Sequence, residues 1–420
     1  MVGENGGGAF VLIYLLSLVM LGIPVLIAEL MIGRKGGHSM VGTLLVLAEK
    51  EGFSPRWQYF GWVAMLAVFL VLSFYCVIAG MTIDYTFVSL SGALEDITSK
   101  SSTDFYYRIL ASPWRLMIFQ GVFVAATTWI VARGIHGGLE KSIRWMMPAL
   151  FVILLLLVVH SMIYGEFLEA LKFMFAPDFS KITAKVALNA FGQAFFSLGV
   201  GVGVMLTYGA YMPRNSSIVR SAMTIGFADG LTAIIAGLAI FPIVFQYGLS
   251  PAEGPGLIFM TLPIAFGQMS GGAYIGALFF VLLVFAALSS SISLLESIVS
   301  RLEETSALGR KKITAIVGAL LWLVGLGTVF SFNIWSNFTP LDFIKPLAGK
   351  TIFGLIDYFA SNIIMPIGGI LMAVIAGWFM SRSSTSEELG MSDERLFFIW
   401  RFLVRYVAPA VVLVIFVSNL

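Results

Sequence analysis

The sequence predicts an all-α, polytopic membrane protein, and three observations carry this prediction. Hydrophobic residues make up 59% of the chain, charged residues only 11%, and the mean hydropathy is +0.95, far from the values of soluble proteins. Long apolar runs recur along all 420 residues, and roughly 20 apolar residues form one helical span. Runs such as ALFVILLLLVV at 149–159 are apolar on every side, whereas a membrane β-strand alternates apolar and polar residues.

Ten membrane-spanning helices are expected in a single transmembrane domain, 1–420, because each of ten apolar runs is long enough to cross the hydrocarbon core. In chain order the runs cover 9–32, 59–90, 113–132, 143–164, 186–211, 218–246, 273–299, 313–331, 352–380 and 396–418.

Basic residues are distributed unevenly between alternate connections. One set of connections holds 17 Lys and Arg residues and the other set holds 8. Cytoplasmic connections carry the excess of Lys and Arg, which places GRKGGHS at 33–39 in the cytoplasm and Met1 on the outer face. No basic segment precedes the first apolar run as a cleavable signal would require, so a preceding helix is expected.

Several functional classes find no support in the residues. The single Cys76 excludes an internal disulfide, and His38, His136 and His160 show no spacing suited to zinc. GGGAF at 6–10 is not followed by the Lys-Ser/Thr pair of a phosphate-binding loop, and the net charge of +2 suggests no nucleic-acid partner. An ATP-driven pump is therefore disfavoured.

The run at 186–211 is expected to break in the middle of the membrane. It contains Gly199, Gly201 and Gly203, and each glycine disfavours a helix by about 1 kcal/mol relative to alanine. The alternative is that these glycines permit close helix crossings, and the pattern alone leaves both interpretations open.

Two further features place polar groups inside spans. FAALSSSISLLE at 285–296 crowds four serines into a short helical segment, and Asp229 lies several residues inside another span. Hydroxyl and carbonyl oxygens suit a small hard cation, and an intramembrane carboxylate needs a partner or a cation. The serines alternatively bond back to preceding carbonyls, and Asp229 alternatively anchors the end of its helix.

Broken helices, oxygen ligands near the midplane and a buried acid are typical of secondary transporters. At this point the chain resembles the neurotransmitter:sodium symporter family over essentially its whole length. The motifs that carry the resemblance are NGGGAF at 5–10, GIPVLIAELMIGRKGG at 22–37, GQAFFSLGVGVGVMLTYGAYM at 192–212, AGLAIFP at 236–242 and FAALSSSISLLE at 285–296.

The resemblance implies a five-plus-five inverted repeat in which NGGGAF at 5–10 follows the first family helix. We therefore expect that first helix to be missing from this chain. Residues 1–164 would then be the remainder of the first repeat, 186–380 the second repeat and 396–418 an extra C-terminal helix.

By resemblance, Tyr75 is the tyrosine that binds the carboxylate of the substrate, with Val71 and Ile78 on the same face of its helix, and Phe196 is the aromatic lid. The resemblance also implies that two positions of the substrate pocket carry small residues. Gly199 and Val202 stand where relatives have larger side chains, which widens the pocket against Ser290 and Leu294. The alternative is that the backbone closes in.

Two sodium sites are implied in the same way. Ser197 and Asp229 match ligands of the first site, whereas the carbonyl of Ala286 and the hydroxyls of Ser289 and Ser290 match ligands of the second. Asp229 replaces a family asparagine, so its charge is expected to take the role of chloride in chloride-dependent members. The remaining ligands of both sites belong to the first helix that we expect to be missing.

Five residues match the family gates. Asp357 is the outer acid and Gln193 its bridging glutamine, whereas Glu304 is the inner acid near Tyr211. Glu29 matches an acid that faces the unwound helices. By resemblance, Asp357 pairs with an arginine of the first helix and Glu304 with an arginine just before that helix, so we expect both partners to belong to the missing segment.

The resemblance implies a multi-pass transporter of the inner or plasma membrane, not an enzyme, surrounded by the lipid bilayer. Its cargo would be sodium and a neutral, bulky hydrophobic or aromatic amino acid, moved by alternating access. The alternative from another class is a transport-inactive membrane fragment or assembly partner, and a channel is a distant third.

Overall fold

The computed structural model describes residues 1–251, 256–391 and 393–418, and all regular structure in these residues is helical. The all-α prediction is therefore confirmed. Within the described residues, nine stretches are long and apolar enough to cross a membrane, and they are Gly8–Gly36, Pro55–Leu90, Pro113–Ala132, Ile135–Tyr164, Ile218–Gln246, Gly272–Thr305, Arg310–Ser331, Ile352–Phe379 and Glu394–Ser418.

Several of these stretches join α-helical turns to short π-helical (η) turns. The α-helices are α1 (Gly8–Ser17), α2 (Ile23–Gly36), α3 (Met40–Glu51), α4 (Gln58–Leu90), α5 (Ser99–Leu110), α6 (Pro113–Ala132), α7 (Lys141–Tyr164), α8 (Phe167–Phe175), α9 (Ala184–Leu198), α10 (Val204–Tyr211), α11 (Ile218–Gln246), α12 (Leu262–Gln268), α13 (Gly272–Thr305), α14 (Arg310–Ser331), α15 (Ile352–Asp357), α16 (Met365–Val374), α17 (Arg382–Leu389), α18 (Glu394–Phe402) and α19 (Ala408–Ser418). The π turns are η1 (Leu18–Gly22), η3 (Ile135–Glu140), η5 (Leu257–Thr261), η7 (Tyr358–Ile364), η8 (Ile375–Phe379) and η9 (Leu403–Val407), and 3₁₀ turns form η2 (Pro55–Trp57), η4 (Phe179–Lys181) and η6 (Lys345–Leu347).

The fifth expected span is two helices rather than one. The run at 186–211 forms α9 and α10, separated by residues 199–203. Gly199, Gly201 and Gly203 have φ angles of 64°, 93° and 73°, which residues with a side chain rarely adopt. The expected break is confirmed, and its cause is this run of left-handed glycines.

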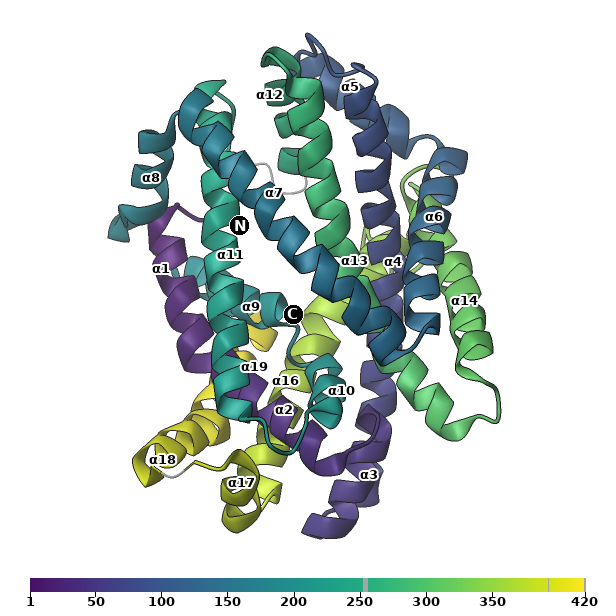
Figure 1. Ribbon diagram of the computed structural model, residues 1–420, viewed down its shortest axis with the longest axis vertical. Coiled ribbons are helices and arrows are strands. Elements are labelled where there is room, and N and C mark those ends of the chain that lie inside the picture. The colour runs from purple at the N-terminus through teal and green to yellow at the C-terminus, as the bar shows by residue number, and fades with distance from the viewer. Residues whose placement is uncertain (252–255, 392, 419–420) are drawn as a thin grey trace.

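The second half of the broken helix, α10, approaches α2 so closely that no side chain fits between the two backbones. A Cβ on Gly33 of α2 would lie 1.9 Å from the Leu206 carbonyl oxygen of α10, and one on Gly209 of α10 would lie 2.3 Å from the Leu30 oxygen. Glycines on both helices therefore allow backbone contact, which is a usual way for membrane helices to pack. Figure 1 shows α2 and α10 crossing below α9, near the centre of the molecule.

The connections with many basic residues gather at one end of the molecule. Helices α3, α17 and α18 lie at the bottom of Figure 1, and α5 and α12 lie at the top. Residues 33–58 and 381–405 hold 8 of the chain's 25 Lys and Arg residues and belong to the bottom group. The excess of basic residues predicts that this end is cytoplasmic.

Candidate functional site

The carboxylate of Glu29 holds the break between α9 and α10. Its Oε1 accepts a hydrogen bond from the backbone N–H of Gly201 at 2.6 Å, and the side chain is fully buried. A Cβ on Gly201 would lie 2.6 Å from the Met365 carbonyl oxygen of α16. The unwound residues are therefore wedged between α2 and α16, and Glu29 faces the broken helix as the resemblance implies.

The two residues expected at the first sodium site are joined by a tyrosine. The hydroxyl of Tyr14 on α1 donates to Oδ2 of Asp229 at 2.8 Å, and its oxygen lies 3.2 Å from the Ser197 hydroxyl. Tyr14, Ser197 and Asp229 line one cavity of about 280 Å³, together with Gln193 and Ala233. The structure thus brings the α9 and α11 groups together.

Sequence reasoning missed Tyr14. It lies in an apolar helix and only 7% of its surface is exposed. A buried tyrosine hydroxyl usually finds a hydrogen-bond partner, which was the one available signal. Nothing local indicates that the partner lies 215 positions along the chain.

The expected substrate residues meet across α4, the broken helix and α13. Val202 packs in one apolar cluster with Tyr75 and Leu294, and the Tyr75 hydroxyl lies close to Ser290. The cluster therefore contains Tyr75, Val202 and Leu294, and their role in binding a substrate stays a prediction.

Three further predicted substrate residues lie on α4 and α9. Val71 and Ile78 are half-buried on α4, four residues before and three residues after Tyr75, so helical periodicity puts them on its face. The Phe196 ring is 58% exposed at the end of α9. A Cβ on Gly199 would meet only the Met205 methyl at 4.0 Å, so the space beside this glycine is open.

The oxygens expected at the second sodium site converge within one turn of α13. The Ser289 hydroxyl donates to the Ala286 carbonyl at 2.8 Å, and the Ser290 hydroxyl donates to the same carbonyl at 3.3 Å. These are the back-bonds that the sequence offered as an alternative. Both hydroxyl oxygens and the carbonyl nevertheless lie together as a group of hard ligands.

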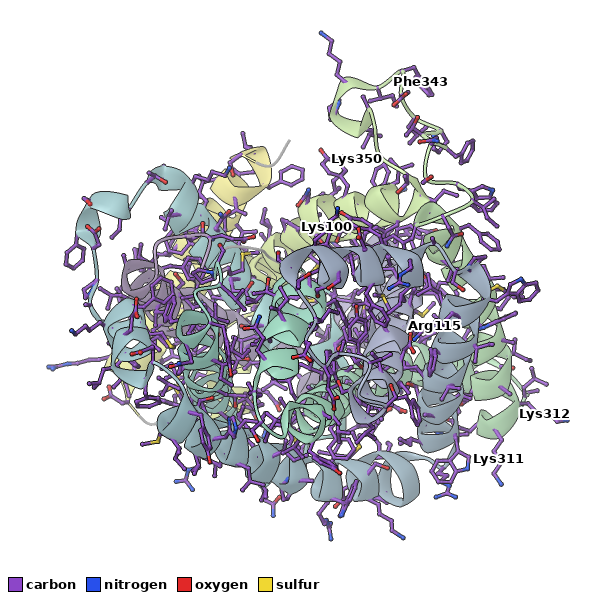
Figure 2. All side chains as sticks on the ribbon, turned by 90° about the horizontal axis from the view of Figure 1, so that it is seen from above. Lys100, Arg115, Lys311, Lys312, Phe343 and Lys350 are labelled. Carbon is purple, nitrogen blue, oxygen red and sulfur yellow. The ribbon has the colours of Figure 1, made fainter. Side chains whose placement is uncertain are left out.

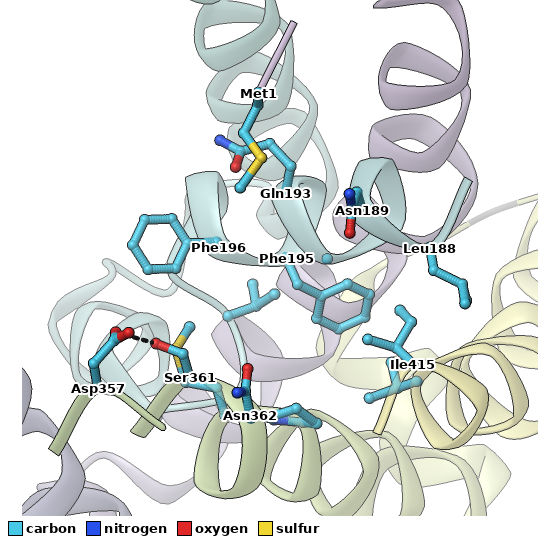
Figure 3. A pocket seen from close by; sticks show the side chains of 15 residues that line it. Met1, Leu188, Asn189, Gln193, Phe195, Phe196, Asp357, Ser361, Asn362 and Ile415 are labelled. Carbon is cyan, nitrogen blue, oxygen red and sulfur yellow. Dashed lines mark hydrogen bonds between the residues drawn. The ribbon is translucent and has the colours of Figure 1, made fainter. Parts of the chain in front are cut away.

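The outer gate residues line a second cavity, of about 400 Å³. Gln193 and Phe196 lie on α9, and Asp357 lies at the end of α15, where it accepts a hydrogen bond from Ser361 at 3.0 Å. Figure 3 shows the Phe196 ring and Asp357 with Ser361 facing each other across this cavity. The structure therefore brings Gln193 and Asp357 to one opening.

The inner acid Glu304 is held by the start of α3. Its carboxylate accepts the Ser39 N–H at 2.5 Å and the Ser39 hydroxyl, and Arg301 and His38 lie 3.4 Å and 3.6 Å away. Glu304 therefore has partners in this chain, which differs from the expectation that its partner belongs to another segment.

Tyr211 has a partner that the resemblance did not indicate. Its hydroxyl donates to Glu296 at 2.8 Å, two turns earlier on α13, and Glu296 also binds Arg310. Glu296 is 1% exposed, and a carboxylate so buried requires paired charge. Sequence reasoning missed Glu296 and Arg310 because their partners lie on other helices.

The site as a whole offers oxygen ligands beside an apolar cluster. Two carboxylates, those of Glu29 and Asp229, and several hydroxyls flank the broken helix, and no group of three or more His, Cys, Asp or Glu residues that could hold a metal ion occurs within the described ranges. Such weakly charged oxygen sets suit monovalent cations better than transition metals.

Comparison with known proteins identifies relatives of this architecture. The model of the sodium:neurotransmitter symporter family matches residues 1–104 and 111–420. The uncharacterized sodium-dependent transporter YhdH of Bacillus subtilis is 36% identical over 99% of this chain and 90% of its own, and a sodium-dependent transporter of Haemophilus influenzae is 33% identical over 100% and 92%. The crystal structure of MhsT in complex with L-phenylalanine matches with a TM-score of 0.89 and 37% identity, covering 100% of this chain and 93% of MhsT.

These matches do not support the expectation that the first family helix is missing. The family model matches from residue 1, and the chain covers at least 90% of the two bacterial relatives and of MhsT. The alternative of a transport-inactive fragment, and the loss of sodium ligands that it entailed, therefore have no support either. The chain belongs to the sodium:neurotransmitter symporter family, whose relatives are sodium-dependent transporters of the membrane.

Proposed function

We propose that this protein couples sodium entry to the uptake of a neutral, bulky aliphatic or aromatic amino acid across the cell membrane. The observation that carries the proposal is the packing of Val202 with Tyr75 and Leu294 beside the break in the α9–α10 helix. The L-phenylalanine in MhsT is consistent with a cargo of this class.

The size of the cargo is argued from two small positions. A Cβ on Gly199 would have open space around it. Val202 is a small side chain in an apolar cluster. The Tyr75 and Ser290 hydroxyls supply polar groups at one end, suited to the carboxylate of an amino acid. A pocket with a few polar groups and a wide apolar part favours large uncharged side chains.

Sodium is proposed to bind at both predicted oxygen groups. Ser197 and Asp229 would hold one ion, and Ala286, Ser289 and Ser290 the other, after the two serine hydroxyls turn away from the Ala286 carbonyl. Chloride would not be required, because the Asp229 carboxylate supplies a fixed negative charge and Ala233 offers no hydroxyl nearby.

Alternating access would follow from the flexibility of the break. The bond between Glu29 and Gly201 joins the unwound residues to α2, so movement of α2 would carry them along. We propose that residues 1–164 and 186–380 act as two inverted repeats and that one bundle rocks against the other. The cavity beside Gln193 and Asp357 would be the outer entrance.

A binding experiment tests the proposed cargo. The assay measures how well an unlabelled amino acid displaces a radiolabelled amino acid from the purified protein, in sodium and in choline buffers. The competitors are leucine, phenylalanine, tryptophan and alanine. We expect the three large amino acids to compete well below the concentration needed for alanine, and only in sodium. Val202→Phe should shift preference towards alanine, because overfilling a packed pocket costs about 1–3 kcal/mol. If alanine competes best against the unmodified protein, the wide-pocket argument is wrong.

A further inference from the structure

A groove on the outside of the bundle lies away from the transport site, between α6 and α14. One cavity of about 510 Å³ is lined there by small residues of both helices, including Gly121, Ala125, Ala315 and Ala319, and by Trp129. Ala125, Ala315 and Ala319 are exposed, so the groove opens to the surroundings of the bundle. In a membrane protein these surroundings are lipid chains.

The groove continues into a basic pocket of about 390 Å³ at the cytoplasmic ends of the two helices. Ala132 and Lys311 line both cavities, and the second one adds Arg133 and Lys312. A Cβ on Gly134 or on Gly309 would meet no atom within 4 Å, so the floor of this pocket is open. The apolar groove and the basic pocket therefore form one continuous surface.

Three cations of this pocket have no acidic partner within the part of the chain that the structure describes. Arg310 is neutralised by Glu296 and Glu303, and its Nε donates to the Val131 carbonyl at 3.0 Å. Lys311, Lys312 and Arg133 form no ion pair there, and Arg133 instead lies over the Trp129 ring at 3.5 Å. Figure 2 shows the Lys311 and Lys312 side chains directed outward at the edge of the bundle.

The start of α14 also favours a bound anion. Its first turn contains Arg310, Lys311 and Lys312 and no acidic residue, and Gly309 provides no side-chain cap. The N-terminal end of a helix is itself partially positive, so basic residues there are unfavourable and an anion is favourable. The local charge is therefore strongly positive on a surface that faces the membrane.

The length of the groove corresponds to one leaflet. From Gly121 to Ala132, α6 rises about 16 Å at 1.5 Å per residue. Half of a hydrocarbon core about 30 Å thick is roughly 15 Å. Trp129, at the basic end, is 59% exposed, and tryptophan is enriched at the boundary between acyl chains and head groups.

We infer that this surface is a binding site for an anionic glycerophospholipid of the cytoplasmic leaflet. The phosphate lies among Lys311, Lys312 and Arg133, and one acyl chain lies along the small residues between α6 and α14. Charge complementarity selects this occupant over a second copy of the chain, because a symmetric contact would bring two basic pockets together. The site is independent of the proposed amino-acid cargo.

Native mass spectrometry of the purified protein in detergent micelles tests the inference. Phosphatidylglycerol and phosphatidylcholine with identical oleoyl chains are titrated separately, and bound lipid is counted. We expect at least tenfold tighter binding of phosphatidylglycerol. Lys311→Gln/Lys312→Gln should weaken phosphatidylglycerol binding roughly 25-fold, since each basic residue near an anionic head group contributes a factor of about five. Lys100→Gln/Lys345→Gln, at two exposed lysines that line neither cavity, should have no effect.

A second pair of variants tests the acyl groove without changing charge. Ala315→Phe fills the groove and should weaken phosphatidylglycerol binding, whereas Leu320→Phe, exposed on α14 but outside the groove lining, should not. Soluble glycerol 3-phosphate should compete only at concentrations far above those of the lipid. Equal binding of both lipids, equal loss in the two lysine variants, equally tight glycerol 3-phosphate, or a dimer that Ala315→Phe dissociates while lipid binding is unchanged would each overturn the inference.

Discussion

The Glu29 carboxylate and the Gly201 amide lie 2.6 Å apart, which joins a fully buried acid of α2 to the middle of the broken helix. The second oxygen, Oε2, is buried and has no hydrogen-bond partner among the described residues. A carboxylate in this position stabilises an unwound backbone whose N–H groups no longer have helical acceptors. The break is therefore stabilised from another helix as well as by its own glycines.

Glu29→Ala should destabilise the protein, because the Gly201 N–H loses its acceptor in a buried setting, which costs about 1–3 kcal/mol. Glu29→Gln keeps an oxygen acceptor and should fold nearly as well, but with a weaker, uncharged hydrogen bond. Melting temperature in detergent and sodium-dependent uptake measure the two effects. Equal melting temperatures for the alanine variant and the unmodified protein would show that the bond does not hold the break.

Gly201→Ala should be among the most damaging single-methyl substitutions. The φ angle of 93° is unfavourable for alanine, and the new Cβ would lie 2.6 Å from the Met365 oxygen. Gly248→Ala is the matched control, because Gly248 also has a positive φ, 61°, but open space around it. We expect Gly248→Ala to lose about 1 kcal/mol and Gly201→Ala clearly more. If the two variants have the same melting temperature, close contact with α16 is not the reason that position 201 requires glycine.

Tyr14→Phe should lower the apparent affinity for sodium with little loss of stability. The substitution removes the hydroxyl that orients Asp229 and Ser197 but keeps the ring in its apolar surroundings. Loss of a hydrogen bond to a charged group typically costs about 1.5–3 kcal/mol, so a shift of roughly tenfold or more in half-saturating sodium is expected. Tyr274→Phe, at a 76% exposed tyrosine, should leave the sodium dependence unchanged.

Asp229→Asn should also weaken sodium binding, because it keeps an oxygen ligand and removes the negative charge. Uptake by the unmodified protein should be the same in chloride and in gluconate at constant sodium. Adding Ala233→Ser to the asparagine variant should restore transport only when chloride is present. A collapse of unmodified uptake in gluconate would show that Asp229 does not replace the anion.

Local patterns predicted the features that depend on neighbouring residues. The glycines at 199, 201 and 203 imposed the break through their own backbone conformations, and Ala286, Ser289 and Ser290 converge because helical spacing places them within one turn. The number of long spans was nonetheless overestimated, since apolar content alone does not distinguish a continuous helix from α9 and α10.

Contacts between distant segments could not be predicted in the same way. The Tyr14–Asp229 and Tyr211–Glu296 pairs join different helices, and Glu304 meets Ser39 across 265 positions. A side chain that needs a partner is visible in a sequence, but the identity of the partner follows from the packing. The resemblance named Glu304 and Tyr211 but did not indicate Ser39 and Glu296 as their partners.

Uptake of radiolabelled phenylalanine into proteoliposomes tests the central claim most directly. With sodium outside, potassium inside and gluconate as the only anion, we predict accumulation above the external concentration, and an ionophore that dissipates the sodium gradient should abolish it. Empty liposomes and a choline buffer provide the baselines. Uptake that reaches the same level with and without the sodium gradient, or that never exceeds the empty liposomes, would contradict sodium-coupled amino-acid symport by this protein.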